Sequence, residues 1–566
     1  MTDGLYDLGT GEHRPFWADA AADEVEARVA ERGEATEGTS GDGRPASREP
    51  DEPIVIKGGV SPSGVPHLGH FNEIMRGYFV AEALRDRGHE VRQVFTTDDR
   101  DRLRKLPRKL ADLEWNVVGL GEVDAGALGR NLGRPYTDIP DPFGCCDSYG
   151  DHFTELLSRA ADAVGVPIDV VSNTDLYESG EFDDAVRHVL ENRETARDVL
   201  SDFQDKVDDD YVPFFARCRE CGNLTETITA IDLAGEAVEY VCEDVDAGDD
   251  TIEGCGHEGT ATFQEGKLPW RFEWPAQWLT LGVDFEPFGK DHAEGSWPSG
   301  ERVAREVFDF EPPVPMVYEW FTLNGDALSS SAGNVITVEE VLELLEVEVL
   351  RYFFTKNPKK QRDFDVGSID RLVDDFDRFE RVYYGEVEAD EDEQRRAERA
   401  YPMVVDEVAD EPPVRIPYTF AAVLGMTDDR DLRVTMARRS GHLPEDADDA
   451  QIDAALARIE KARAWAVRTD NEFNYRLAEE LPAVEFDPEV AAALEDLADF
   501  VEAEDPDDET LQGEIYETAK AADVEVGDLF GAGYRLFLDE DQGPRLGPFL
   551  AAMDTEFVVR RLRREA

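Results

Sequence analysis

The chain has 566 residues, which is too long for a single hydrophobic core and predicts three or four domains. Hydrophobic residues make up 41% of the sequence and aromatic residues 10%, which excludes a largely disordered or solvating acidic protein. The formal net charge of −70, from 128 acidic and 58 basic residues, predicts a surface suited to molar salt. At about 1 M ionic strength the Debye length is only about 3 Å, so dense like charges can coexist.

Cysteine usage and hydropathy indicate a reducing compartment. Four of the six cysteines lie between positions 218 and 255, and the adjacent Cys145 and Cys146 cannot easily pair with each other. The sequence opens without a signal peptide and has no apolar run of about 18 residues. We therefore expect a cytoplasmic protein without membrane contact, and we expect it to be a monomer.

The first half of the chain alternates between strand and helix patterns. A helix at 18–32 precedes an almost entirely polar stretch, 33–53, which we interpret as a flexible insert. The next signals are a strand at 54–56, a glycine turn at 58–59, a helix at 68–87 and strands at 91–97 and 168–171. This order predicts an α/β fold with a parallel sheet and crossover helices. From about 366 onward the pattern is helical and acidic and indicates an all-α domain.

The segment from Pro62 to His70 lies between the first strand and the following helix. Gly64 and Gly69 allow a nucleotide to approach the backbone closely, and the helix N-terminus offers free N–H groups to phosphate. His67 and His70 share a face of the first turn, where they can donate to an α-phosphate as its negative charge grows. The alternative is a pair of surface histidines, but the proline and both glycines after a strand favour a nucleotide site.

This segment resembles the first signature motif of class I aminoacyl-tRNA synthetases. The second motif of that class, a phosphate loop rich in lysine and serine, is matched at 327–334. The loop residues that the resemblance places on phosphate are Leu328, Ser329, Ser330 and Ser331. Alanine stands at both usual lysine positions, 327 and 332, so the resemblance implies hydroxyl and N–H donors without a point charge. Alone, this segment would be interpreted as a serine-rich turn.

Longer strings resemble one family within that class, the class I lysyl-tRNA synthetases. They lie at 96–107, 140–145, 148–153, 266–271, 274–278, 282–292 and 318–321, and the resemblance covers roughly the first two thirds of the chain. It implies that Gly289 and Asp291 hold the adenosine ribose, a role for which a simple turn is the alternative. The positions that it places on ATP are Pro62, Gly64, His67, Gly69, His70, Gly289, Asp291, Leu328 and Ser330.

The resemblance also implies a pocket for the amino acid. Its lining residues would be Gly59, Ser61, Trp270, His292 and Tyr318. Aromatic rings suit the apolar stem of a lysine side chain, and a carboxylate suits its ammonium. The candidate carboxylates are Asp99, Glu273 and Asp284, and the sequence does not choose among them. Core packing is the alternative for Trp270 and the nearby Trp274.

The cysteine cluster comprises Cys218, Cys221, Cys242 and Cys255, with His257 as a possible substitute for one of them. A Cys-x-x-Cys knuckle followed by a later pair predicts a tetrahedral zinc site of structural role, because the intervening sequence is too polar for a core of its own. Four free thiols are the alternative.

The resemblance divides the chain into five parts. They are the N-terminal helix and acidic insert (1–52), the first half of a Rossmann-like catalytic domain (53–210), a zinc-binding insertion (211–265), the second catalytic half with the phosphate loop (266–365) and a helical anticodon-binding domain (366–566). Candidate anticodon contacts are Arg458, Arg463, Arg468 and Arg476, since arginine stacks on bases and clamps phosphates.

The resulting hypothesis is a lysine–tRNA ligase that uses ATP with Mg²⁺ to form lysyl-adenylate and then transfers lysine to tRNA(Lys). One alternative is another class I synthetase, glutamyl or arginyl for example. A second is a tRNA-binding paralogue without catalysis, whose phosphate loop has lost its lysines. The intact histidine motif argues against the paralogue.

Overall fold

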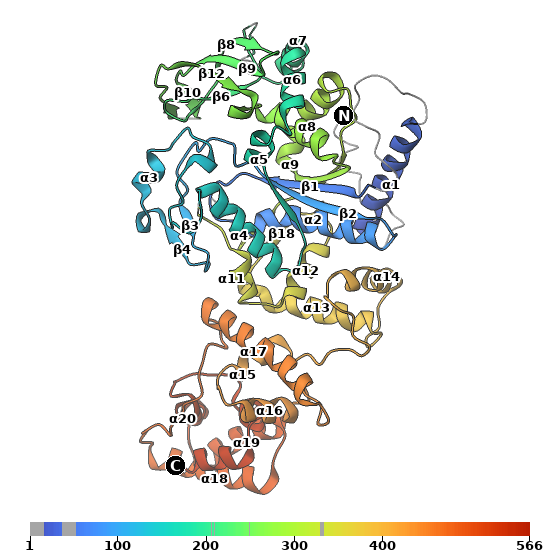
Figure 1. The fold of residues 1–566 in the computed structure, drawn as a ribbon. Helices are drawn as coiled ribbons and strands as arrows, with labels where there is room; N and C mark the ends of the chain where they lie inside the picture. The colour runs from blue at the N-terminus through green and yellow to red at the C-terminus, as the bar shows by residue number, and fades with distance from the viewer. Residues whose placement is uncertain are drawn as a thin grey trace. The chain divides into compact units, whose positions relative to one another are not determined.

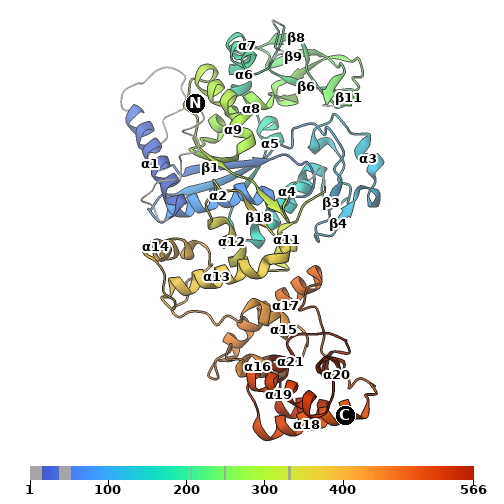
Figure 2. The same ribbon diagram turned by 180° about the vertical axis from the view of Figure 1, so that it is seen from behind.

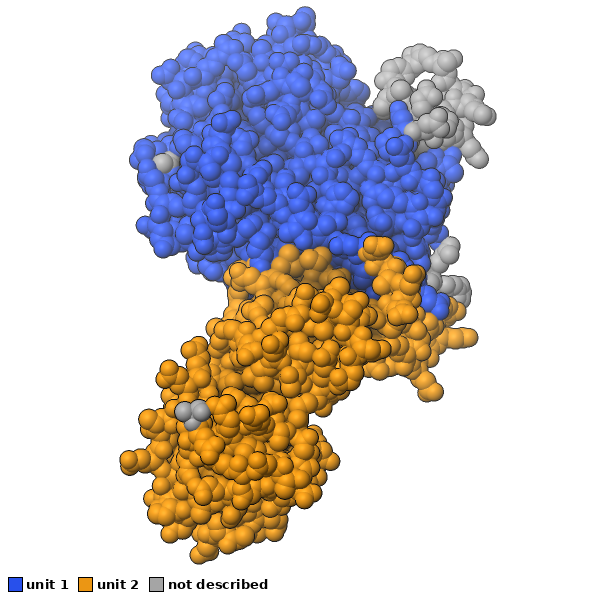
Figure 3. All heavy atoms as spheres, turned by 60° about the horizontal axis from the view of Figure 1, so that its bottom comes forward, with its two compact units in different colours: residues 1–339, 351–364, 398–406 blue, residues 340–350, 365–397, 407–566 orange. Residues whose placement is uncertain are grey.

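The computed structural model describes residues 16–36, 52–204, 207–208, 210–247, 250–328 and 333–565. They form two compact units, coloured separately in Figure 3. Unit 1 comprises residues 1–339, 351–364 and 398–406, and unit 2 comprises 340–350, 365–397 and 407–566. Each is described by itself.

A parallel five-stranded sheet forms the centre of unit 1 (Figures 1 and 2). Its strands, in spatial order, are β15 (Val314–Tyr318), β14 (Phe285–Gly289), β1 (Ile54–Val60), β2 (Val91–Thr97) and β5 (Asp169–Ser172). The chain runs outward from β1 to β5 and then returns to the other side of β1. The order therefore reverses between β1 and β14, and ligands of such sheets bind at the carboxyl ends of the strands at this point.

Helices cover both faces of the sheet because β1 is apolar on both sides. Ile56 faces Gly77 of α2 (Leu68–Arg85), whereas Val55 packs with Trp274 and Trp278 of α8 (Trp270–Leu281). The remaining helices of this unit's first part are α1 (Trp17–Thr36), α3 (Ala125–Gly129), α4 (Tyr149–Ala163), α5 (Asn173–Glu178), α6 (Asp183–Glu191) and α7 (Arg193–Ser201). Later come α9 (Lys290–Glu294) and α10 (Trp297–Arg302). Helices α11 (Val338–Leu342) and α12 (Val347–Thr355) each include residues of both units.

Several small sheets lie outside this core, and their strands pair antiparallel except for β16 and β18, which pair parallel. The inserted ones comprise β6 (Phe215–Arg217), β7 (Leu224–Thr225), β8 (Thr227–Asp232), β9 (Ala237–Val241), β10 (Val245–Ala247), β11 (Asp250–Ile252), β12 (Glu258–Thr262) and β13 (Gly266–Lys267). Two others are β3 (Lys109–Ala111) with β4 (Val117–Gly119), and β16 (Phe321–Leu323) with β17 (Asp326–Ala327) and β18 (Arg362–Phe364).

Four expectations need correction. Gly58 and Gly59 do not form a turn but continue β1, which pairs with β2 as far as Val60 and Thr97. They are required as glycines because a Cβ at Gly58 would lie 2.7 Å from Phe95, and one at Gly59 would lie 2.5 Å from Thr96 Oγ1. Residues 33–36, expected in the insert, are the end of α1, and most of the expected insert, 37–51, lies outside the described residues. The third strand is displaced by one residue and the helix after β1 ends at Arg85.

The described residues of unit 2 form helices joined by loops, without a strand. Its helices are α13 (Ile369–Tyr383), α14 (Glu391–Ala400, which ends in unit 1), α15 (Tyr418–Leu424), α16 (Arg430–Arg439), α17 (Asp449–Thr469), α18 (Pro488–Glu504), α19 (Asp508–Ala521), α20 (Val526–Leu538), α21 (Leu546–Ala551) and α22 (Thr555–Leu562). Trp465 anchors the core of this unit, because its indole N–H donates to the Val366 carbonyl and its ring packs on Tyr418. Among the described residues of the whole chain, no helix is both long and apolar enough to cross a membrane.

Candidate active site

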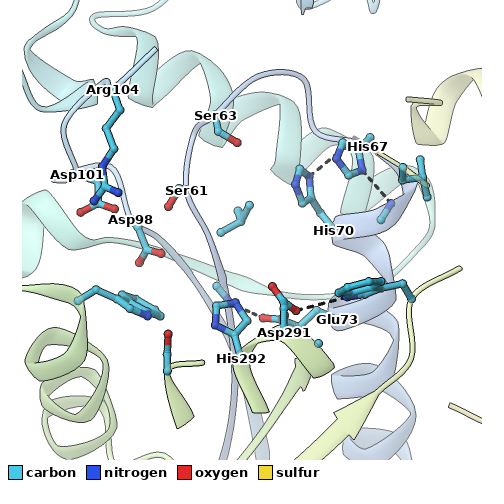
Figure 4. Close-up of a pocket in the computed structure, with 18 of the residues that line it drawn as sticks. Ser61, Ser63, His67, His70, Glu73, Asp98, Asp101, Arg104, Asp291 and His292 are labelled. Carbon is cyan, nitrogen blue, oxygen red and sulfur yellow. Dashed lines mark hydrogen bonds between the residues drawn. The ribbon is translucent and has the colours of Figure 1, made fainter. Parts of the chain in front are cut away.

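The turn after β1 brings His67 and His70 together at the start of α2. His67 is the N-cap residue, and its Nδ1 accepts the Gly69 N–H at 3.0 Å. His70 Nδ1 accepts the His67 N–H at 3.2 Å, so each ring caps the helix end. The rings stack with their centroids 3.9 Å apart, as Figure 4 shows. Gly69 must be a glycine here, because a Cβ would lie 2.7 Å from the His67 ring.

Burial and these hydrogen bonds determine the protonation state and the tautomer of both rings. Burial lowers the pKa of His67 to about 4, and burial together with His67 lowers the pKa of His70 well below its ordinary value. Both imidazoles are therefore neutral near pH 7. Because Nδ1 of each ring accepts a backbone N–H, the proton of each neutral ring resides on Nε2. The pair thus has two Nε2–H donors, and both residues line one pocket.

Glu73 lies one helical turn beyond His70 and lines the same pocket. Its carboxylate accepts the Gly59 N–H at 2.7 Å and the Tyr318 hydroxyl at 2.9 Å, which joins β1, α2 and β15. Burial raises the pKa of Glu73 to about 8, and the nearby Glu286 adds to the shift. The sequence analysis missed this residue, although its spacing of three from His70 places it on the same helix face.

A second buried carboxylate, Asp98, lies at the carboxyl end of β2 and also lines the pocket. Asn173 and Gln277 donate to its Oδ1, at 3.0 and 3.3 Å. Burial, followed by the charges of Asp101 and Glu273, raises the pKa of Asp98 to about 7. Neither Glu73 nor Asp98 has a cationic hydrogen-bond partner among the described residues, so both carboxylates are available to a cationic ligand.

The three candidate carboxylates for the lysine ammonium lie elsewhere. Asp284 accepts the backbone N–H of Val55 inside the sheet, and Asp99 accepts from Thr97 and Thr174. Glu273 is fully buried and accepts from Lys267 Nζ at 2.9 Å and from the Tyr177 hydroxyl at 2.8 Å. None of the three lines the pocket, because each satisfies a donor of the fold itself.

The other wall of the pocket follows β14. Gly289 is the N-cap of α9, and a Cβ there would lie 2.6 Å from Asp291 Oδ1. Asp291 is exposed to the pocket and accepts from the Trp320 indole at 3.4 Å. The ring centroids of Trp270 and His292 are 6.3 Å apart, and both residues line the pocket.

The pocket has a volume of about 1210 Å³ and gathers most of the predicted residues. Those that line it are Gly59, Ser61, His67, Gly69, His70, Trp270, Gly289, Asp291, His292, Tyr318 and Leu328. Pro62 and Gly64 are buried within the turn and do not line it, whereas Ser63, which the sequence analysis passed over, does. Ser329, Ser330 and Ser331 lie outside the described residues.

The described residues on either side of residues 329–331 lie beside the start of α2, which carries His67 and His70. The Leu68 N–H donates to the Ile336 carbonyl at 2.9 Å, and Leu328 Cδ1 lies 3.9 Å from the Cβ position of Gly69. Asn334 Nδ2 donates to the Ala327 carbonyl at 3.0 Å and joins the two flanks. The described residues of the two segments that resemble synthetase motifs, 62–70 and 327–334, therefore lie together where the strand order of the parallel sheet reverses. The His67 and His70 rings offer N–H donors there.

Comparison with known families agrees with this geometry. Residues 16–405 match the family described as tRNA synthetases class I (K). The chain belongs to this synthetase family. The lysine–tRNA ligase of Natronomonas pharaonis is 77% identical to this synthetase and that of Haloarcula marismortui 65%, each with 100% of both chains covered. The lysine–tRNA ligase of Pyrococcus horikoshii is 31% identical, over 97% of this chain and 99% of the relative. The α/β fold and the class of enzyme predicted from the sequence are thereby confirmed.

The synthetase also brings its four clustered cysteines together. Cys218 and Cys221 follow β6, Cys242 follows β9 and Cys255 precedes β12. The Sγ atoms of Cys218 and Cys255 are 3.6 Å apart, as are those of Cys221 and Cys242, and all four lie within 4.8 Å of one another. His257 is not part of this group. The arrangement is a possible metal site.

One of the four arginines proposed for anticodon contact is a structural residue of the synthetase. Arg458 is 3% exposed and pairs with Glu346 at 2.5 Å and with Asp377 at 2.7 Å. Its guanidinium also donates to the Ile416 carbonyl, so all three of its nitrogens bond within the fold. The exposed Arg468 and Arg476 pair with acidic neighbours, and the half-buried Arg463 donates to the Tyr475 carbonyl.

Proposed function

We propose that this synthetase activates lysine with ATP and transfers it to the 3′ end of tRNA(Lys), releasing AMP and pyrophosphate. The observation that carries the proposal is the neutral histidine pair beside two buried carboxylates in one pocket. The names of the relatives agree with it. Lysine brings two ammonium groups, and the pocket offers two buried carboxylates, Glu73 and Asp98, that have no cationic hydrogen-bond partner among the described residues.

The histidine pair would act on the α-phosphate of ATP. The lysine carboxylate attacks this phosphorus, the bond to the pyrophosphate oxygen breaks, and negative charge grows on the equatorial oxygens. Two fixed Nε2–H donors at a helix N-terminus stabilise that charge more than the ground state. Because the rings are neutral, they act as dipolar donors and do not need to lose or gain a proton.

The adenosine and the phosphates would lie along the segments that the family motifs predict. Asp291 would accept from the ribose hydroxyls, with Gly289 allowing close approach. Ser329, Ser330 and Ser331 would offer hydroxyl groups to the phosphates. Magnesium would accompany ATP and offset the phosphate charge.

Glu73 is proposed as the partner of the lysine ε-ammonium. Tyr318 donates to its carboxylate, and the rings of Tyr318, His292 and Trp270 line the same pocket and suit the apolar stem of the side chain. Asp98, at the end of β2, would then pair with the α-ammonium. Buried carboxylates of raised pKa give up their protons when an ammonium arrives, so the pocket rejects neutral and acidic side chains.

The four-cysteine group is proposed to hold a structural zinc ion. Its Sγ separations of 3.6 Å agree with a tetrahedron of Zn–S bonds of about 2.3 Å, whose edges are about 3.8 Å. The ion would fasten the loops between β6, β9 and β12. The helical unit 2 is proposed to recognise the anticodon, although the structure offers no exposed cluster of unpaired arginines among the four that we named.

Amino-acid-dependent exchange of labelled pyrophosphate into ATP tests the proposal. Purified chain in molar KCl should show exchange with lysine and no exchange with the other standard amino acids. Exchange with glutamate or arginine would assign the chain to another specificity. No exchange with any amino acid would favour a tRNA-binding protein without catalysis, provided that the chain is folded by circular dichroism.

A further inference from the structure

A buried ion pair joins two strands of the central sheet. Lys57 of β1 and Glu286 of β14 have side chains that are 1% and 3% exposed, and Lys57 Nζ lies 2.8 Å from Glu286 Oε1. The two strands are neighbours at the position where the strand order reverses. Neither residue lines the pocket, and neither takes part in the proposed reaction.

Glu286 also accepts hydrogen bonds from two tryptophan side chains. The indole N–H of Trp274 donates to Oε1 at 2.8 Å, and the indole N–H of Trp278 donates to Oε2. Both rings are buried and lie four residues apart on α8, so they share a face of that helix. A buried indole N–H requires an acceptor, and one carboxylate supplies it for both rings. The carboxylate therefore determines how each ring is rotated within the core.

Trp274 transmits this restraint to the pocket. Its ring stacks on that of Trp270, with centroids 5.3 Å apart and an angle of 14° between the planes, and its centroid lies 5.5 Å from that of His292. Trp270 and His292 line the pocket, whereas Trp274 lies behind them in the core. The Trp278 ring packs instead on Trp274 and Trp297, with centroids 5.0 and 5.2 Å away. Trp274 thus links the Glu286 carboxylate to two rings of the pocket wall.

Core packing alone would not require a charged pair at this position. Two buried charges lose their hydration, and apolar residues of similar volume often replace such a pair without loss of stability. Apolar residues would nevertheless remove the acceptor of both indole N–H groups. Charge-assisted hydrogen bonds are strong and directional, so the pair adds a fixed orientation of the rings to the packing of the core.

We propose that Glu286 is a positioning residue for lysine binding. Through Trp274 it holds the rings of Trp270 and His292 in place for the apolar stem of the substrate lysine. A wall that is already fixed loses little conformational freedom when the substrate binds, which favours affinity. Lys57 balances the charge of Glu286 inside the sheet. The inference rests on the proposed function, because it assumes that these two rings contact the lysine stem.

The first test compares Trp274→Phe with Trp278→Phe in lysine-dependent pyrophosphate exchange. Each variant keeps an aromatic ring in the core and removes one N–H donor to Glu286, but the Trp278 ring does not pack on the pocket rings. We expect KM for lysine to rise about tenfold in Trp274→Phe and less than twofold in the matched control Trp278→Phe. KM for ATP should stay within twofold of the natural value in both variants.

The second test changes the carboxylate itself, in the double variant Lys57→Met with Glu286→Gln. Both charges disappear together, so that neither is left unpaired in the core. Glutamine keeps the length of the side chain but offers one acceptor oxygen for two indole groups. We expect KM for lysine to rise about fivefold or more, with kcat and KM for ATP within twofold. The preference for lysine over ornithine in kcat/KM should fall by a similar factor, because a movable wall no longer favours one stem length.

An unchanged KM for lysine in Trp274→Phe, with the variant folded by circular dichroism, would overturn the proposal. A rise of KM by the same factor for lysine and for ATP, with the preference over ornithine retained, would also overturn it, because the pair would then only stabilise the fold. If the double variant does not fold, the two tryptophan variants decide, since both keep the ion pair. Absence of lysine-dependent exchange in the natural chain would contradict the proposed function instead.

Discussion

His67 and His70 stack at the start of α2 with their ring centroids 3.9 Å apart, and each accepts a backbone N–H through Nδ1. Because Nδ1 of each ring is an acceptor, the proton of each neutral imidazole lies on Nε2. It predicts that His67→Ala or His70→Ala lowers the rate of pyrophosphate exchange by on the order of 10²–10³, since one donor to transition-state charge has that effect. KM for ATP should change much less.

His67→Asn separates this catalytic role from helix capping. Asparagine caps helices well and keeps an acceptor for the Gly69 N–H, but it has no counterpart of Nε2–H. We expect natural thermal stability with a rate as low as that of the alanine variant. Natural rates in both alanine variants would refute the assignment.

Lysine binding should depend on pH through Glu73, whose pKa burial raises to about 8. The protonated acid cannot pair with an ammonium, which itself stays charged with a pKa of about 10.4. Affinity for lysine should therefore rise about tenfold per pH unit between pH 7 and pH 8, above the pKa of about 7 of Asp98, and level off above pH 8. Isothermal calorimetry with lysine measures this profile.

Glu73→Gln should weaken lysine binding and flatten that profile. Glu294→Gln, at an exposed position of α9 that does not line the pocket, is the matched control and should keep the natural slope. A slope that persists in Glu73→Gln would assign the titration to another group, and Asp98→Asn would then be the variant to measure.

Removal of zinc from the four-cysteine group should loosen the insertion more than the sheet. Cys221→Ser should lose one metal equivalent and lower the thermal midpoint, because the metal closes loops between short strands that have little core of their own. Hydrogen exchange should rise first in residues 215–262 and leave β1 and β2 protected. A metal-free chain of natural stability would show that the cysteines do not hold a structural ion.

The sequence predicted elements with a regular apolar pattern and missed those that depend on distant partners. β2 was predicted over its full length because five of its seven residues are β-branched or aromatic, types that favour strands. The end of β1 was missed because Gly58 and Gly59 are turn residues by type. Only the pairing with β2, and the closeness of Phe95 and Thr96, reveals why they are glycines in a strand.

In the site, too, residues that belong to a local motif were predicted, whereas charged residues with distant partners were not. Residues fixed by a local motif, such as His67 and Asp291, were predicted at the pocket where they lie. Glu273 was misplaced because its partner Lys267 makes it part of the buried fold. Arg458 was misplaced because its partners lie 112 and 81 positions away in the sequence. Only the tertiary structure shows that such charges are already paired.

Activity should rise with salt over the low-salt range. A formal charge of −70 repels tRNA and the chain's own surface, and screening weakens both effects, whereas short-range contacts persist. Each phosphate contact opposes this trend, because it lowers the logarithm of tRNA affinity by about 0.7 to 0.9 for each tenfold rise in salt concentration. We expect repulsion to dominate, so that charging increases from tenths molar toward molar KCl. Highest activity at low salt in a chain that circular dichroism shows to be folded would refute salt adaptation.

Charging of tRNA(Lys) with labelled lysine, followed in molar KCl, tests the central claim most directly. We predict that acid-stable label accumulates on tRNA(Lys) in an ATP-dependent manner, and that His70→Ala abolishes most of the initial rate. A tRNA of another acceptor identity should remain uncharged. Failure of the folded natural chain to charge tRNA(Lys), or charging with a different amino acid instead, would contradict the account.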